Sequence, residues 1–157
     1  ISSPSSSIAR SLVKVFEKAL GLIKQRINDQ KVTLIKKWAK DSPQAKIDEK
    51  LLVQAYLNLL INALDSMPSG GKLEVGVALD PSNKGDKILV TIEDTGSGIP
   101  KELIPKLFQP FFTTKDYGVG LGLPIADGII RSHGGKLHFE SKEKVGTKIT
   151  IELPVTA

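Results

Sequence analysis

Three short segments of the sequence combine carboxylate, amide and glycine residues at spacings that could bind a ligand. In Asp94-Thr95-Gly96-Ser97-Gly98, a carboxylate and two glycines follow a predicted strand. A buried carboxylate there would accept a hydrogen bond from an exocyclic amine, and the glycines would let the backbone approach a ligand closely. The glycines at 118, 120 and 122 lead into a predicted helix, whose first N–H groups could bind an anion such as phosphate. Lys115, just before them, adds a positive charge.

The third segment is a polar stripe on a predicted helix, formed by Asn58, Asn62 and Asp65. Residues spaced by four and three positions share one helix face. Amides are poor choices for a helix interior, so such a stripe facing a cleft suggests a hard cation bound through carbonyl oxygens. For this stripe taken alone, a solvated polar face is the commoner interpretation.

Neither established nucleotide-binding fingerprint is present in the chain. Gly70-Gly71-Lys72-Leu73 and Gly134-Gly135-Lys136-Leu137 lack the earlier glycine and the hydroxyl of G-x-x-x-x-G-K-[ST], and the glycines at 118, 120 and 122 do not fit G-x-G-x-x-G. A phosphate site in this chain therefore belongs to a different architecture.

Apolar periodicity predicts the elements that must position these segments. The expected elements are a helix over 5–28, strands over 32–38 and 45–47, a helix over 48–66, strands over 73–79 and 88–92, a helix over 121–132, and strands over 137–141 and 146–153. They predict an α+β fold: a two-layer sandwich with a mixed, mostly antiparallel sheet of about five strands, covered on one face by about three helices. We expect one domain over 1–157, with 1–7 as disordered or linker residues.

Composition narrows the function classes. The 157 residues are 40% apolar and include no cysteine and two histidines, which excludes disulfide scaffolds, thiolate metal sites and cysteine nucleophiles. A net charge of +5 favours an anionic partner only weakly, because acidic residues are interspersed, and no dense basic stripe indicates nucleic-acid binding. No segment resembles a signal peptide or a membrane span, so we expect a soluble domain without direct membrane contact. We expect this domain to be cytoplasmic, whether or not a longer parent protein is anchored in a membrane.

Five motifs in order resemble the N, G1, F, G2 and G3 boxes of the ATP-binding domain of sensor histidine kinases, in the superfamily of gyrase, Hsp90, histidine kinases and MutL. The motifs are Asn58-x-x-x-Asn62-Ala63, Asp94-x-Gly96-x-Gly98, Phe108 to Lys115, Gly118-x-Gly120-Leu121-Gly122 and Gly146-Thr147. The resemblance spans about 8–154 and implies a Bergerat-type ATP-binding fold. The segments 62–67 and 110–115 are similar to the nitrogen-regulation-type subgroup.

The resemblance implies a role for each motif. Asp94 would accept the adenine amino group, Asn62 would hold Mg²⁺, Lys115 would reach the terminal phosphates, and Asp65 would act through Mg²⁺-bound water. Residues 108–118 would form a lid, with Phe111 and Phe112 as its hinge packing. The implied nucleotide-binding residues are Asn58, Asn62, Asp65, Asp94, Gly96, Gly98, Ile99, Thr113, Thr114, Lys115, Gly118, Val119, Gly120, Leu121, Gly122, Leu123 and Thr147.

The implied activity is transfer of the γ-phosphate of ATP to a histidine on a separate dimerisation hairpin, for relay to a response regulator. His133 and His138 lie outside any phosphoacceptor motif, and we expect both to be structural, with His133 capping a helix end. The chain is then expected to be a monomeric catalytic module that lacks this hairpin, so it should bind ATP or ADP without phosphorylating itself.

Three alternatives remain at this point. The first is an ATP-hydrolysing module of the gyrase, Hsp90 or MutL type. Against it, hydrolases of the superfamily carry a glutamate at the position of Asn58, and an amide cannot act as that base, so we expect poor ATP hydrolysis. A serine-phosphorylating relative of the anti-sigma type is the second. The third is an interaction domain that kept the fold and lost the nucleotide, against which the intact glycines argue.

Overall fold

The computed structural model describes residues 8–40, 43–80, 87–106 and 122–155. Its elements are β1 (Ile8–Ser11), α1 (Leu12–Leu22), α2 (Lys24–Asp29), β2 (Val32–Trp38), β3 (Gln44–Ile47), α3 (Glu49–Asp65), β4 (Gly71–Leu79), β5 (Lys87–Asp94), the 3-10 helix η2 (Lys101–Lys106), α4 (Gly122–Ser132), β6 (Lys136–Lys142) and β7 (Gly146–Pro154). The expected linker at 1–7 lies outside the described residues, as does most of the loop between β4 and β5.

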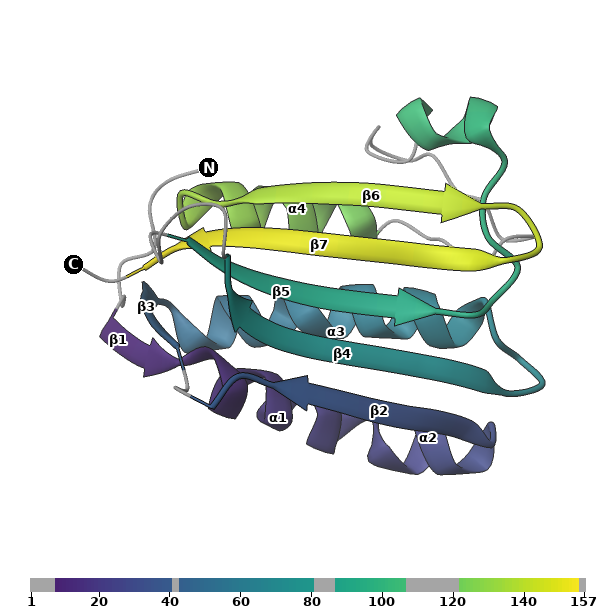
Figure 1. Ribbon diagram of the computed structural model, residues 1–157, viewed down its shortest axis with the longest axis horizontal. Helices are drawn as coiled ribbons and strands as arrows, with labels where there is room; N and C mark the ends of the chain where they lie inside the picture. The colour runs from purple at the N-terminus through teal and green to yellow at the C-terminus, as the bar shows by residue number, and fades with distance from the viewer. Residues whose placement is uncertain (1–7, 41–42, 81–86, 107–121, 156–157) are drawn as a thin grey trace.

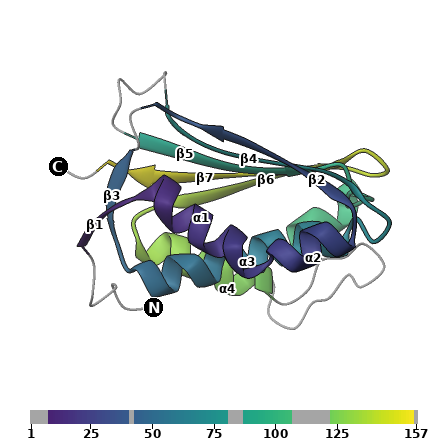
Figure 2. The same ribbon diagram turned by 90° about the horizontal axis from the view of Figure 1, so that it is seen from below.

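Five strands form the main sheet, in the order β2-β4-β5-β7-β6. The β2–β4 pair is parallel and the other three pairs are antiparallel. The helices lie on one face of this sheet, which gives the two layers seen edge-on in Figure 2. The predicted mixed, mostly antiparallel sandwich is confirmed.

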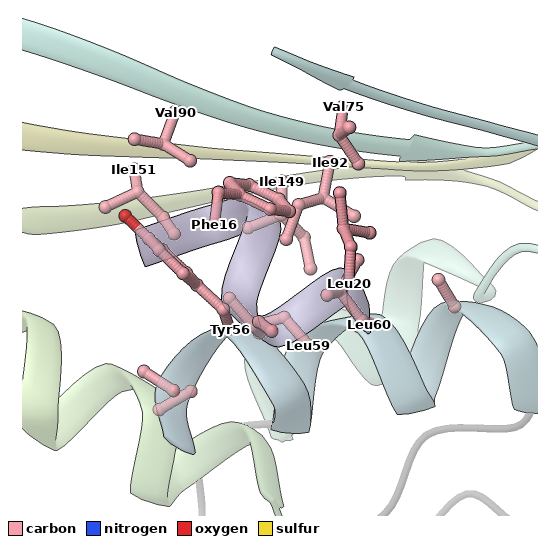
Figure 3. Close-up of a cluster of buried hydrophobic side chains, with 14 of the residues drawn as sticks. Phe16, Leu20, Tyr56, Leu59, Leu60, Val75, Val90, Ile92, Ile149 and Ile151 are labelled. Carbon is pink, nitrogen blue, oxygen red and sulfur yellow. The ribbon is translucent and has the colours of Figure 1, made fainter. Parts of the chain in front are cut away.

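The core lies between the two layers. Strand residues alternate between a face that packs against the helices and an open face, because successive side chains in a strand point to opposite sides. Val90 and Ile92 of β5 and Ile149 and Ile151 of β7 therefore point toward the helices (Figure 3). Other residues of this buried cluster are Phe16, Leu20, Tyr56, Leu59, Leu60 and Val75.

Tyr56 is the largest fully buried side chain, and its ring stacks on that of Phe16, with 4.7 Å between ring centroids and 22° between ring planes. Phe16 also meets Trp38 at a centroid distance of 5.5 Å. These ring contacts join α3 and α1 to the edge strand β2.

The prediction of one helix over 5–28 is wrong for the described part of that range. Residues 8–11 form β1, which pairs antiparallel with β3 in a separate two-stranded sheet. The helix begins at Leu12, where the Ser11 side chain accepts a hydrogen bond from the Lys14 N–H, and it breaks at Ile23 before α2. The apolar spacing at 8, 12 and 15 suits a helix, but pairing with a distant strand decides the structure of the first four residues.

The start of α3 is as predicted. Asp48 is its N-cap, with the carboxylate accepting from the Leu51 N–H at 3.2 Å, and Glu49 adds negative charge in the first turn. The helix then runs to Asp65 and carries the predicted polar stripe alongside the buried face that packs under the sheet. The one described helix absent from the prediction is η2, within a stretch that we expected to be irregular.

Candidate functional site

Four elements bring the candidate residues together at one end of the molecule. The C-terminal ends of β5 and α3 and the N-terminal ends of β7 and α4 meet there, on the right in Figure 1. Asn62, Asp94, Leu123 and Thr147 line one cavity of about 20 Å³ between the sheet and the helices. Residues predicted from three of the five motifs are thus neighbours in space, together with Leu123, which directly follows a fourth.

Asp94 is the buried carboxylate at the centre of this site. It is 7% exposed, and its Oδ1 accepts a hydrogen bond from the Gly96 N–H at 2.9 Å. Burial raises the pKa of Asp94, an effect opposed by hydrogen bonds from the Gly96 and Thr147 backbones and the Ser66 side chain and reinforced by the nearby charge of Glu93. The side chain is therefore a preoriented acceptor whose charge is only partly compensated by the protein.

The glycines of the G1 and G3 motifs are required by contacts inside the protein. A Cβ on Gly96 would lie 2.1 Å from Ser66 Oγ, and one on Gly98, which has φ +69, would lie 2.0 Å from the Lys142 carbonyl oxygen. A Cβ on Gly146, which has φ +147, would lie 2.1 Å from the carbonyl oxygen of Asp94. From the sequence we expected Gly96 and Gly98 to let a ligand come close to the backbone. In the structure, their missing side chains instead let the turn after β5 pack against the end of α3 and against the β6–β7 turn.

Ser141 positions two of the predicted residues. Its hydroxyl lies 2.8 Å from Thr147 Oγ1 and accepts a hydrogen bond from the Ile99 N–H at 2.7 Å. Ile99 itself is buried, at 1% exposed. Ser141 therefore fixes both the turn that follows Asp94 and the threonine beside it.

Asn62 faces the same cavity from α3. Its amide nitrogen is buried and has no hydrogen-bond partner among the described residues. An unsatisfied buried donor costs about 1–3 kcal/mol, so a ligand oxygen that accepts a hydrogen bond from this nitrogen would stabilise the site. Asn58 lies one turn earlier on the same helix and is half-buried.

The side chains at this site suit Mg²⁺, which is bound partly by phosphates and water, better than a metal ion held by protein ligands alone. Within the described residues, no group of three or more His, Cys, Asp or Glu could hold a metal ion. Mg²⁺ keeps several waters and is usually bound by one or two protein oxygens together with substrate phosphates. The carbonyl oxygen of Asn62 can supply one such ligand, so the residues fit the cofactor implied by the resemblance.

Asp65 has a partner that the sequence analysis did not consider. Its carboxylate forms an ion pair with Arg26 of α2, and both side chains are about 40% exposed. Gln30, which follows α2, donates from Nε2 to the carbonyl oxygens of Leu64 and Met67. These contacts tie α2 to the C-terminal end of α3, next to the site.

The structure does not test the predicted lid or most of the G2 glycines. Gly122, at the start of α4, and Leu123, which is fully buried, are described. The other predicted residues in this region lie outside the described part of the chain: Thr113, Thr114, Lys115, Gly118, Val119, Gly120 and Leu121.

Sequence reasoning missed several residues that complete the cavity. Ser66 lines the cavity directly after α3, where a serine has no distinctive signal. Ser141 does not line the cavity but contacts Thr147, which does, from an inward position of β6. The strand alternation that places Phe139 toward the helices also places Ser141 there, so this signal was available. The remaining lining residues that were not predicted are Leu59, Ala63, Phe139 and Ile149.

Both histidines have structural contacts. His133 Nδ1 lies 2.8 Å from the Ile129 carbonyl oxygen, and its Nε2 accepts a hydrogen bond from the Asp48 N–H at 3.0 Å. His138, on the open face of the sheet, pairs with Glu152. Neither ring lines the cavity that contains Asp94.

Residues 47–157 match the family model of the histidine kinase-, DNA gyrase B- and HSP90-like ATPases. The chain belongs to this family. Within it, sporulation kinase A of Bacillus subtilis (strain 168) is 33% identical over 144 residues, which cover 92% of this chain and 23% of that protein. The chain therefore spans about a quarter of the length of this curated relative.

Solved structures of this ATPase family agree with the match. The catalytic domain of histidine kinase ThkA superposes with a TM-score of 0.83 at 29% identity, covering 96% of this chain and 99% of that domain. The structure of ThkA in complex with the response regulator protein TrrA matches with a TM-score of 0.80 at 26% identity, covering 96% of this chain and 42% of that chain. The chain is thus an ATP-binding domain of the histidine kinase type. No helix in the described part of it is long and apolar enough to cross a membrane.

Proposed function

We propose that this domain binds ATP with Mg²⁺ and positions the γ-phosphate for transfer to a histidine on a separate helical hairpin. The observation that carries the proposal is that the buried Asp94 carboxylate and the Asn62 side chain meet at one cavity between the sheet and the helices. The Asn62 amide nitrogen, a buried donor without a described partner, can donate to a phosphate oxygen. These two groups suit opposite ends of a nucleotide. The carboxylate accepts from the adenine amino group, and the amide oxygen serves a cation on the phosphates.

The chain's own residues would then bind and orient the nucleotide. Asp94 and Thr147 hold the adenine end, with Ile99 buried beneath it and Gly98 fixing the turn. The residues at 118–122 would bind the phosphates through backbone N–H groups, and Thr113, Thr114 and Lys115 would complete the lid. Mg²⁺, when bound, neutralises phosphate charge and lowers the cost of transfer.

No described side chain at the site supplies a nucleophile or a base for phosphate transfer. The carboxylate of Asp94 faces backbone donors, and both histidines have structural contacts elsewhere. The domain therefore acts by positioning and electrostatic stabilisation, and the acceptor histidine and its base come from another domain.

Further parts of the proposal rest on the resemblance and the relatives. We place the chain in the nitrogen-regulation-type subgroup on the segments 62–67 and 110–115. Relay to a response regulator is supported by the ThkA–TrrA complex, a structure of a relative with its regulator. We assign the domain to the cytoplasm, where its nucleotide is available, and expect it to be monomeric when isolated and to bind no nucleic acid.

Binding and transfer can be tested separately. Calorimetry should show Mg²⁺-dependent binding of ATP and ADP, abolished by Asp94→Asn, while Asn62→Ala should remove mainly the Mg²⁺ dependence. Unchanged affinity in Asp94→Asn would contradict the assignment of the adenine end. Glu49→Gln is the control, because Glu49 lies at the opposite end of α3 from Asn62 and, in the described part of the chain, lines no cavity with Asp94.

The transfer test uses ATP labelled in the γ-phosphate and a histidine-bearing hairpin supplied as a second polypeptide. Acid-labile label should appear on the hairpin and none on this domain. Because Asn58 cannot activate water, the domain alone should hydrolyse ATP negligibly. Steady turnover without the hairpin would favour the hydrolase alternative, and acid-stable label on a serine of a partner protein would favour the anti-sigma type.

A further inference from the structure

The edge strand β2 leaves half of its backbone groups unpaired in the described part of the chain. It pairs only with β4 among the described strands, through parallel bonding. The Ala39 N–H donates to the Val77 carbonyl oxygen at 2.8 Å, so odd-numbered residues direct their backbone groups toward β4. Leu34 and Lys36 therefore direct their N–H and C=O groups away from the sheet, toward a possible additional strand.

A groove of about 350 Å³ lies next to this free edge, between β2 and the helices α1 and α2. Figure 1 shows the two helices running along the strand at the border of the sheet. The groove is lined by Leu20 and Ile27 from the helices and by Val32 and Leu34 from the strand, an apolar floor. An extended segment added to β2 would place every second side chain over this floor.

Gly21 keeps the groove open. It lies in the last turn of α1, and no described atom comes within 4 Å of the position a Cβ would occupy. Gly21 does not have a positive φ, so a left-handed helix cap does not explain why a glycine occupies this position. A glycine in a helix costs about 0.5–1 kcal/mol relative to alanine, yet no contact in the described structure needs the missing side chain. The glycine at position 21 is explained if the open space beside it is occupied by a ligand.

The part of the chain that forms this groove carries an excess of positive charge, although Lys18, Arg26 and Lys37 form ion pairs with acidic residues of other elements. Residues 8–40, which form β1, α1, α2 and β2, contain nine of the 22 basic residues and two of the 17 acidic ones. The rest of the chain therefore carries a slight excess of acidic residues. At the groove itself, Lys36 pairs with Glu17, whereas Lys24 has no ion-pair partner among the described residues.

We propose that this groove and the free edge of β2 bind an extended acidic segment of a protein, with alternating apolar and acidic residues, as an added strand. Its backbone pairs with Leu34 and Lys36, its apolar side chains occupy the floor, and its carboxylates face the lysines. A concave floor beside a free strand edge suits a peptide better than a lipid surface, which would need a protruding apolar tip. This surface shares no lining residue with the cavity that contains Asp94.

The first test uses a fluorescent peptide of about eight residues that alternates valine with glutamate or aspartate. Anisotropy should show saturable binding that weakens as salt is raised, and amide hydrogen exchange should slow at Leu34 and Lys36. A peptide with lysine in place of each acidic residue should not bind. Equal binding of both peptides, no saturation at millimolar peptide, or protection elsewhere in the chain would overturn the proposal.

Variants at Gly21 separate blocked binding from misfolding. Gly21→Leu fills the groove from a helix position that tolerates a side chain, so it should weaken peptide binding at least tenfold while the melting temperature stays the same or rises. Gly21→Ala, the matched control, should change binding less than threefold, and Lys24→Glu should weaken it severalfold. Undiminished binding in Gly21→Leu would overturn the proposal, as would tight binding to phosphatidylserine vesicles together with no peptide binding.

Discussion

At the residue scale, the charge state of Asp94 links the fold to the ligand. Burial raises the pKa of this carboxyl, and the Gly96, Thr147 and Ser66 hydrogen bonds offset that effect only in part. A raised pKa in the folded state means that the protonated form is favoured, so ionised Asp94 opposes stability as pH rises through that pKa. A hydrogen-bond donor on a bound nucleotide would further stabilise the ionised carboxylate of Asp94, which the protein's own hydrogen bonds stabilise only in part.

We predict that nucleotide affinity falls as the pH is lowered. Because the pKa of Asp94 is raised, this fall should begin at a higher pH than it would with an ordinary aspartate. The adenine amino group needs the ionised carboxylate, so binding must release a proton once pH is below the pKa of the free site. Calorimetry measures this release when it is done in two buffers of different ionisation enthalpy, from neutral pH down to the lowest pH at which the domain stays folded. Because the charge of Glu93 raises the pKa of Asp94, Glu93→Gln should move the midpoint to lower pH. A midpoint no higher than that of an ordinary aspartate would contradict the prediction.

Tyr56 supports a prediction about the core. Its hydroxyl is buried without a hydrogen-bond partner among the described residues, and burial raises the pKa of the phenol. We expect Tyr56→Phe to keep the stacking on Phe16 and to increase the free energy of unfolding by about 1 kcal/mol, because it removes an unsatisfied polar group.

The alkaline limit of stability provides a second measurement for Tyr56. Because its pKa is raised, the Tyr56 hydroxyl stays protonated in the folded state. Its contribution to the free energy of unfolding is therefore fully present below the ordinary tyrosine pKa and is lost as the pH rises above that value. Urea unfolding at neutral and alkaline pH should show a smaller alkaline loss in Tyr56→Phe than in the unmodified protein. A destabilised variant would show instead that the hydroxyl has a partner.

The residue scale also shows what the sequence could and could not predict. The resemblance assigned Asp94 and Asn62 to one nucleotide site, and in the structure both line one cavity, because the ends of β5 and α3 meet there. The sequence could not show why Gly96 is a glycine, since the reason is the Ser66 hydroxyl, 30 positions away in the chain. Such contacts depend on how two elements meet, which local patterns do not contain.

At the element scale, His133 joins the two helices that carry the site. It follows α4, lies 2.8 Å from the Ile129 carbonyl oxygen through Nδ1, and accepts from the N–H of Asp48, the N-cap of α3. The sequence predicted the capping contact, because a histidine before two glycines is typical of a helix end. The bond to Asp48 spans 85 positions and could not be predicted locally.

We predict that His133→Ala lowers the free energy of unfolding by about 1–2 kcal/mol, because it leaves the Asp48 N–H and the Ile129 carbonyl without their partner. His138→Ala is the matched control. Its ring is 53% exposed and pairs with Glu152 on the open face, so it should change stability by less than about 0.5 kcal/mol. Denaturant unfolding of both variants measures the difference. Equal losses would show that the link between α3 and α4 contributes nothing.

The N-terminal elements illustrate the limit of periodicity. Apolar residues at 8, 12, 15, 16 and 19 fit one long helix, yet 8–11 pair with β3. Ser11 followed by an apolar repeat was a signal for a helix beginning at Leu12, and it is the N-cap in the structure. To choose between a helix that begins near residue 5 and one that begins at Leu12, one must know that residues 44–47 form a partner strand.

At the scale of the whole molecule, total charge was less informative than its placement. The sum of +5 suggested only a weak preference for anions, because acidic residues occur throughout the sequence. The fold gathers β1, α1, α2 and β2 at one border of the sheet, and these carry most of the excess positive charge (Figure 1). The site with Asp94 and Asn62 lies on other elements, so the charge is better explained by a second binding surface than by the nucleotide's phosphates.

The nucleotide site, by contrast, joins the two layers of the fold, since Asp94 and Thr147 belong to the sheet and Asn62 and Leu123 to the helices. A ligand held by both layers stabilises the folded state by mass action, by about 2.7 kcal/mol at 100 times its dissociation constant. For a domain of this size, we predict that saturating ADP with Mg²⁺ raises the melting temperature by about 5–10 °C. Asp94→Asn should lose this shift, and Glu49→Gln, at the far end of α3, should keep it. An equal shift in Asp94→Asn would mean that the ligand binds elsewhere and does not bridge the layers.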